Sequence, residues 1–79
     1  MTAPAHAKST VEIEINEKEY RVESPTTGAH LRELGSIPAA NDLFRETRGG
    51  GPDELIRPEG VYDLKEEDEF YDLPKGTVG

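Results

Sequence analysis

Two stretches of strictly alternating apolar and polar residues constrain the fold of this chain most strongly. Residues 11–15 read Val-Glu-Ile-Glu-Ile, and after the polar segment 16–18 the alternation resumes over residues 19–23 with Tyr20 and Val22. Side chains in a strand point alternately to its two faces, so this period predicts two half-buried strands. Two such strands joined by a short polar turn predict a β-hairpin, whose apolar face another element must cover.

A short helix over residues 28–34 is the predicted cover. The preceding segment 24–27, Ser-Pro-Thr-Thr, interrupts the strand and supplies hydroxyl groups for helix capping. Leu31 and Leu34 stand three residues apart, on one helical face, and Gly35 follows as the stop. A helix of about two turns is unstable alone, so we expect both leucines to pack on the apolar face of the hairpin.

The second half of the chain predicts short strands separated by turns. After a connector anchored by Ile37, the expected segments are a strand at 41–47, a glycine-rich turn at 48–53, an edge strand at 54–57, an extended segment or single helical turn at 61–64, a charged loop at 65–69 and a last strand at 69–73. Pro74 ends this strand because it lacks a backbone donor. The predicted class is α+β, with short strands and one short helix.

The length of the chain limits it to one domain. A chain of 79 residues has room for one core and no second layer of machinery. Residues 1–10 are small, polar and interrupted by a proline, so they predict a disordered leader. Residues 11–73 form the predicted domain, and residues 74–79 form a flexible tail.

The net charge of −8 excludes some classes of partner. Phosphate groups would repel this surface, so we expect neither a nucleic-acid partner nor an anionic membrane. Solubility alone explains such a charge, and a basic protein partner also fits it. The chain has no cysteine, no apolar run long enough to span a membrane and no apolar block of a secretory signal, so we expect a cytoplasmic protein.

The residue types offer no catalytic constellation. The glycine run at 49–51 lacks the lysine and hydroxyl of a nucleotide-binding loop, so it predicts a hairpin turn. The acidic run at 66–69 lacks the ligand spacing of a calcium loop and predicts a solvated loop, or else a docking patch for a basic partner. His6 and His30 have no orienting partner in the sequence. We therefore expect no enzymatic activity, no metal site and no cofactor.

The tail combines a proline stop with a terminal glycine. After Pro74 come Lys75, Gly76, Thr77, Val78 and Gly79. Six extended residues reach roughly 20 Å, and glycine has no side chain to block a narrow channel, so this segment could thread into the active site of a partner enzyme. Frayed, glycine-containing tails also end many chains that have no such role.

The order of these segments resembles the ubiquitin-like β-grasp fold. This resemblance implies an α+β domain with a mixed four- to five-stranded sheet packed on one short helix. Residues 35–44, Gly-Ser-Ile-Pro-Ala-Ala-Asn-Asp-Leu-Phe, resemble the helix exit and third strand of ubiquitin. Residues 41–46, the glycine run, and residues 61–64 followed by 69–71 resemble more closely the bacterial multiubiquitin domain. The resemblance covers residues 11–73. That family is encoded beside an ATP-dependent activating enzyme, a conjugating enzyme and a JAB-type metallopeptidase, in ubiquitination-like operons linked to antiphage defence.

This resemblance implies a function for the tail. It implies that the carboxylate of Gly79 is adenylated with ATP, passed to a partner's cysteine as a thioester and joined to a lysine of a target protein. Ubiquitin and the sulfur carriers end in Gly-Gly, whereas this chain ends in Val78-Gly79, as the eukaryotic ubiquitin-fold modifier ends in Val-Gly. A β-grasp sulfur carrier and a non-covalent acidic interaction module are the alternatives. A docking surface is expected on the face of the sheet opposite the helix.

Overall fold

The computed structural model describes residues 9–76 as seven strands and one helix. The elements follow in the order β1 (Ser9–Ile15), β2 (Lys18–Ser24), β3 (Thr26–Thr27), α1 (Gly28–Leu34), β4 (Asn41–Arg45), β5 (Glu54–Ile56), β6 (Val61–Tyr62) and β7 (Asp68–Pro74). Five of these strands make one sheet in the order β2-β1-β7-β4-β5, and β3 pairs with β6 in a small second sheet.

The predicted hairpin forms from β1 and β2, which pair antiparallel over seven residues each. Asn16 and Glu17 make the turn with φ values of 52° and 69°, as a two-residue type I′ connection requires. The strand begins two residues earlier than the alternation indicates, because Ser9 and Thr10 also pair with β2. These two residues were expected in the disordered leader, whose remainder, residues 1–8, lies outside the described part of the chain.

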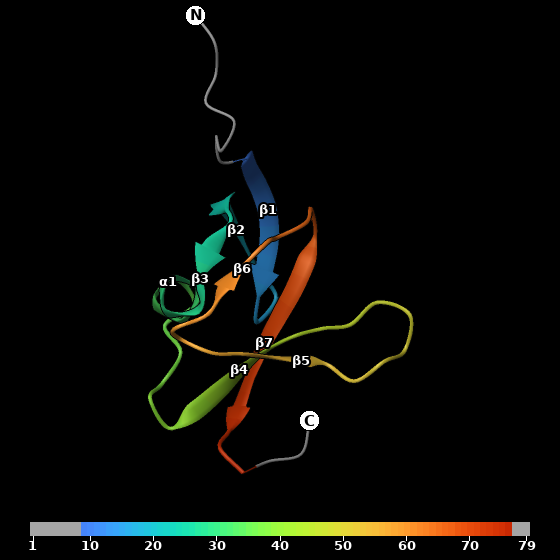
Figure 1. Ribbon diagram of the computed structural model, residues 1–79. Coiled ribbons are helices and arrows are strands. Elements are labelled where there is room, and N and C mark those ends of the chain that lie inside the picture. Colours follow the sequence, from blue (N-terminus) through green and yellow to red (C-terminus); the bar gives the residue numbers. More distant parts are fainter. Residues whose placement is uncertain (1–8, 77–79) are drawn as a thin grey trace, which may run out of the picture.

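The last strand lies in the middle of the sheet. β7 pairs parallel with β1 and antiparallel with β4, so the sheet is mixed (Figure 1). β4 pairs antiparallel with β5 across the glycine-rich loop, which confirms the predicted turn there. β7 is therefore fixed on both sides by strands from distant parts of the sequence.

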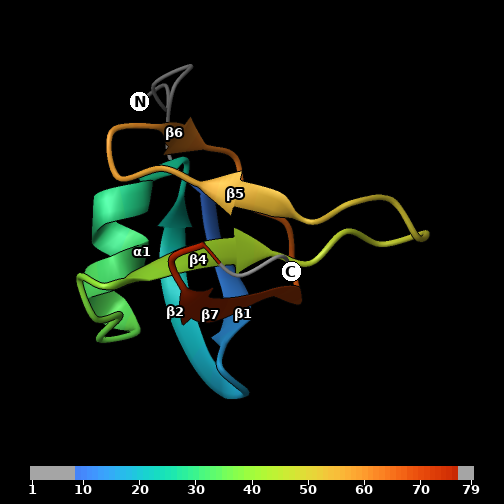
Figure 2. The same cartoon turned by 90° about the horizontal axis from the view of Figure 1, so that it is seen from below.

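The helix covers one face of the large sheet (Figure 2). Thr27 caps α1, since its side-chain oxygen accepts a hydrogen bond from the backbone N–H of His30 at 3.1 Å. Leu31 is fully buried and Leu34 packs at the edge of the core, as predicted. The buried apolar residues are Val11, Ile13, Ile15, Val22, Leu31, Leu43, Ile56, Leu64 and Phe70.

The small second sheet was not expected from the sequence. Thr26 lies opposite Tyr62, and Thr27 lies opposite Val61. Just outside it, the backbone N–H of Leu64 donates to Ser24 Oγ at 2.7 Å, which ties this segment to the end of β2. The segment at 61–64, for which a helical turn was an alternative, is thus extended at Val61 and Tyr62.

The result is a small α+β domain with a mixed five-stranded sheet and one short helix. This arrangement is compatible with a β-grasp. None of the helical structure within residues 9–76 is long and apolar enough to cross a membrane.

Candidate functional site

The end of β7, which we call the tail root because the tail begins at Pro74, is fixed to the domain by side-chain hydrogen bonds. Both carboxylate oxygens of Asp72 accept hydrogen bonds, from Asn16 Nδ2 at 2.8 Å and from Asn41 Nδ2 at 2.6 Å. The hydrogen bond from Asn41, together with that from Asn16, holds the pKa of Asp72 below its usual value. The turn after β1 and the start of β4 are thereby joined to β7 two residues before Pro74.

The described part of the chain ends four residues after this anchor, at Gly76. The backbone N–H of Lys75 donates to the carbonyl of Ala40 at 3.0 Å, and Lys75 itself is exposed. Gly76 follows with φ of 85°, a value that L side chains rarely adopt, and a Cβ atom there would meet nothing within 4 Å. Thr77, Val78 and Gly79, the other predicted residues of the tail, lie outside the described residues.

An apolar patch lies on the face of the sheet opposite the helix. The rings of Phe44 and Tyr71 stack with centroids 5.5 Å apart. Leu55 lies opposite Phe44 on β5, and Leu73 follows Tyr71 by two residues on the same face of β7. Phe44, Tyr71 and Leu73 are half-buried, and Leu55 is exposed. These four residues, named the outer patch here, end one residue before Pro74.

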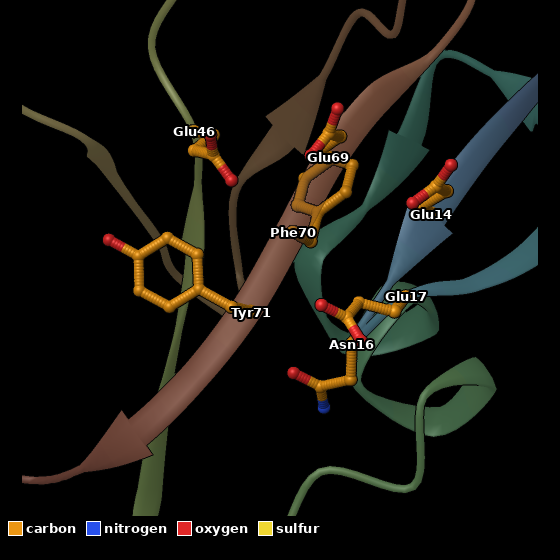
Figure 3. A pocket seen from close by; sticks show the side chains of 7 residues that line it. All are labelled: Glu14, Asn16, Glu17, Glu46, Glu69, Phe70 and Tyr71. Carbon is orange, nitrogen blue, oxygen red and sulfur yellow. The ribbon is translucent and has the colours of Figure 1, made fainter.

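Carboxylates border the outer patch on the side of β1. A hollow of about 350 Å³ next to Tyr71 is lined by Glu14, Glu17, Glu46 and Glu69, together with Asn16, Phe70 and Tyr71. Figure 3 shows Glu14 and Glu69 side by side on β1 and β7, with Glu46 across from them beside Tyr71. The surface near the tail root therefore combines two stacked aromatic rings with concentrated negative charge.

Tyr71 also fixes the loop between β4 and β5. Its hydroxyl donates to Asp53, whose other carboxylate oxygen accepts the backbone N–H of Thr47 at 2.9 Å. The hydrogen bond to Asp53, followed by burial and by the charges of Asp53 and Glu46, raises the pKa of Tyr71 to about 12. The same hydrogen bond, with that from Thr47, lowers the pKa of Asp53.

Replacing Asp53 with asparagine is expected to return the pKa of Tyr71 toward the ordinary tyrosine value of about 10. Because the pKa of the folded state is raised, the hydrogen bond contributes stability below about pH 10, and this contribution is lost as the pH rises through about 12. Ultraviolet titration, with Tyr71→Phe identifying the Tyr71 step, measures the shift. Asp63→Asn removes an exposed carboxylate elsewhere and should leave that step unchanged; an unchanged step in Asp53→Asn would contradict the assignment.

The acidic run at 66–69 is not the simple solvated loop that its composition indicates. Asp68 is only 7% exposed and binds Arg45, with Nη1 to Oδ2 at 3.2 Å. Glu66 Oε1 accepts the backbone N–H of Glu12 at 2.8 Å. Asp68 is thus buried in an ion pair and Glu66 is tied to β1 by a hydrogen bond, while the residues Glu66, Glu67 and Glu69 are exposed.

From the sequence we expected a docking surface on the face of the sheet opposite the helix. The sequence did not identify which side chains form the outer patch on that face. The signal available was the pair Leu43-Phe44: adjacent residues of a strand face opposite sides, so only one of the two enters the core. Leu43 is the buried one. His30 is exposed on α1, and His6 lies outside the described residues. Among residues 9–76, no group of three or more His, Cys, Asp or Glu side chains could hold a metal ion.

Comparison with models of protein families, with curated proteins and with solved structures finds no match to this chain.

Proposed function

We propose that this chain is a ubiquitin-like protein modifier of β-grasp type, joined to lysines of target proteins through the carboxylate of Gly79. In this proposal an ATP-dependent activating enzyme adenylates Gly79 and receives it as a thioester, a conjugating enzyme transfers it to the lysine, and a JAB-type metallopeptidase removes it. The pathway is a bacterial ubiquitination-like one linked to antiphage defence. The chain supplies recognition and reach, while its partners supply the chemistry.

The observation that carries the proposal is the position of β7. This strand is held between β1 and β4, and its Asp72 is fixed by two asparagines. Gly76 follows with φ of 85°, and a Cβ atom there would meet nothing within 4 Å. An enzyme whose active site must receive a carboxylate from a folded substrate needs that carboxylate on a segment that reaches beyond a rigid body, and the fixed end of β7 supplies the rigid body. The sheet order, with the first and last strands parallel at its centre, supports a β-grasp.

The outer patch supports a docking role in the same reaction. Phe44 and Tyr71 provide apolar area close to the tail root, where an activating or conjugating enzyme would have to bind to receive the tail. Interfaces of this kind are enriched in aromatic residues at their centre, with polar residues at the rim. The carboxylates beside Tyr71 then favour a basic surface on the enzyme.

The test is reconstitution with ATP and the cognate activating and conjugating enzymes. We expect an ATP-dependent adduct on each enzyme that a thiol reagent removes. We expect deletion of Gly79 to abolish it, because the new terminal carboxylate, that of Val78, lies one residue short and carries a β-branched side chain. Gly51→Ala is the matched control, since a Cβ atom there would meet only Thr47 Cγ2 at 3.4 Å, and it should form the adduct normally. Adduct formation that survives deletion of Gly79 would contradict the proposal. Exchange of a terminal oxygen for sulfur in the intact mass would indicate the sulfur carrier instead.

A further inference from the structure

The edge strand β2 has one side that no other strand of the described chain occupies. All seven of its residues pair with β1 on one side, and β2 is the border of the five-stranded sheet (Figure 2). The pairing runs without a bulge from Ser9 opposite Ser24 to Ile15 opposite Lys18. A long, regular edge of this kind is a template for an added strand.

The contacts of Glu12 establish which backbone groups of β2 face outward. Its carbonyl accepts the backbone N–H of Glu67 at 2.7 Å, and its own N–H donates to Glu66 Oε1 at 2.8 Å. Both groups therefore point away from β2, so Glu12 and Arg21 form a non-hydrogen-bonded pair. The backbone groups of Arg21 then face the outside, and the alternation of the ladder gives Glu19 and Glu23 the same direction.

An open groove lies beside this edge on the side of the helix. Its volume is about 650 Å³, and its apolar lining comes from Val22, Pro25 and Val61. Val61 is 69% exposed, so its side chain is available for contact with an added strand. A strand added along β2 would direct every second side chain toward this groove, so those side chains should be apolar.

The other face of the same edge is acidic. Glu14 of β1 lies directly opposite Glu19 of β2, a like-charge pair that weakens the hairpin. Glu23 adds a third carboxylate, and Arg21 is the cation between Glu19 and Glu23. Glu14 also borders the hollow at Tyr71 (Figure 3). A basic side chain on an added strand would lie opposite Glu19 and relieve its repulsion from Glu14.

We propose that the free edge of β2 binds an extended peptide segment of a partner protein, as an added strand whose side chains alternate between apolar and basic. The apolar side chains enter the groove at Val61, and the basic ones lie opposite Glu19 and Glu23. A second copy of the chain is a poor occupant, because each copy has a net charge of −8 and pairing centred on Arg21 opposes Glu19 to Glu23. This interaction is non-covalent and does not involve Gly79.

The probe is a short capped peptide in which lysine and valine alternate. With the full chain, we expect slowed amide hydrogen exchange at Glu19, Arg21 and Glu23 and a measurable affinity by fluorescence titration. Glu19→Lys is expected to weaken binding by about fivefold, since an attraction at the edge becomes a repulsion. The same change at Glu33, an exposed residue of α1, is the control and should leave the affinity within about twofold.

Two further peptides test the strand geometry and the charge. A version N-methylated at alternate residues, placed so that the blocked groups face β2, should lose binding, and a version that alternates glutamate with valine should not bind. Equal binding by either peptide, or an unchanged affinity in Glu19→Lys, would overturn the proposal. Glu19→Lys replaces the like-charge pair with Glu14 by an attractive pair, so the variant should have a higher free energy of unfolding than the parent chain. Weakened binding by this variant therefore cannot result from unfolding.

The proposed binding at the β2 edge and the proposed conjugation through Gly79 can be tested independently. The chain with Gly79 deleted should bind the lysine–valine peptide with unchanged affinity. If the thioester forms but the peptide shows no protection of β2, this inference falls and the proposed function stands.

Discussion

Replacing Gly28 with alanine is expected to lower the free energy of unfolding by about 3 kcal/mol. A Cβ atom on Gly28 would lie 2.0 Å from the backbone oxygen of Arg57 and 2.7 Å from its carbonyl carbon. Backbone atoms cannot rotate away as a side chain can, so α1 or the segment after β5 must move. The hydrogen bonds from Gly28 N to Gly60 O and from Ala29 N to Pro58 O, both 3.0 Å, would be strained.

Helix propensity favours alanine over glycine and so opposes this loss, but its contribution to the free energy of unfolding is smaller. Alanine is favoured over glycine inside a helix by up to about 1 kcal/mol, which does not offset overpacking and the weakening of two hydrogen bonds. Urea unfolding measures the difference. Gly51→Ala should be near neutral, because its Cβ atom would make only an ordinary van der Waals contact with Thr47 Cγ2 at 3.4 Å. Gly28→Ala as stable as the parent chain would contradict the close packing of α1 on the segment around Arg57.

Replacing Arg45 with methionine is expected to lower the free energy of unfolding by a similar amount, about 3 kcal/mol. The Arg45 side chain is 19% exposed and joins Asp68 at 3.2 Å, Glu54 at 2.6 Å and the carbonyl of Asp63 at 2.8 Å. Burial lowers its pKa, but the hydrogen bonds and charges of Glu54 and Asp68 outweigh this effect and leave the pKa of Arg45 raised. Methionine keeps much of the volume and leaves Asp68, whose side chain is 9% exposed, without its closest cation.

The matched control is the exposed ion pair between Arg57 and Glu59. Its atoms Nε and Oε2 lie 3.0 Å apart, as close as in many buried pairs, but the side chains are 65% and 70% exposed. Arg57→Met should therefore change stability by less than about 1 kcal/mol. Asp68→Asn in the Arg45→Met background should recover part of the loss, because it removes a buried charge whose remaining cation, Arg48, lies 3.5 Å away and is 61% exposed. Equal losses in Arg45→Met and Arg57→Met in urea unfolding would show that the burial of Asp68 does not determine the effect.

The sequence predicted those parts of the fold that local pattern determines. The hairpin follows from alternation, since a shift of one residue would expose Ile13 and Ile15 and bury glutamates. The helix follows from Thr27, Leu31 and Gly35, which are a cap, a core residue and a stop within nine positions. These features act within about ten residues of one another and leave a period or a boundary in the sequence.

The remaining features depend on contacts that the sequence does not display. The small sheet pairs β3 with β6 and places Thr26 opposite Tyr62. Each of these strands has only two residues, which is too short to show a periodic pattern in the sequence. The burial of Asp68 depends on Arg45, 23 positions away, so an acidic run looked uniformly solvated. Predicting the outer patch requires knowing which of two adjacent apolar residues, Leu43 or Phe44, faces the core. The register between β4 and β7 decides this.

The two proposed surfaces differ in what they offer a partner, although Glu14 borders both. The outer patch is apolar at its centre and lies next to the tail root, whereas the β2 edge combines outward backbone groups with a groove and carboxylates. Enzymes that handle the tail would bind the first surface, and extended basic segments would bind the second. A single domain with a net charge of −8 could thus hold two different partners at once.

Mass spectrometry of tryptic peptides from the native host tests the central claim most directly. Trypsin cleaves after Lys75, so conjugation through Gly79 would leave the remnant Gly-Thr-Val-Gly on the Nζ of a modified lysine. We predict target peptides that carry this remnant in the presence of the activating enzyme and lack it when that enzyme is deleted. A host in which this chain is abundant, its activating enzyme is present and no lysine carries the remnant would contradict the account.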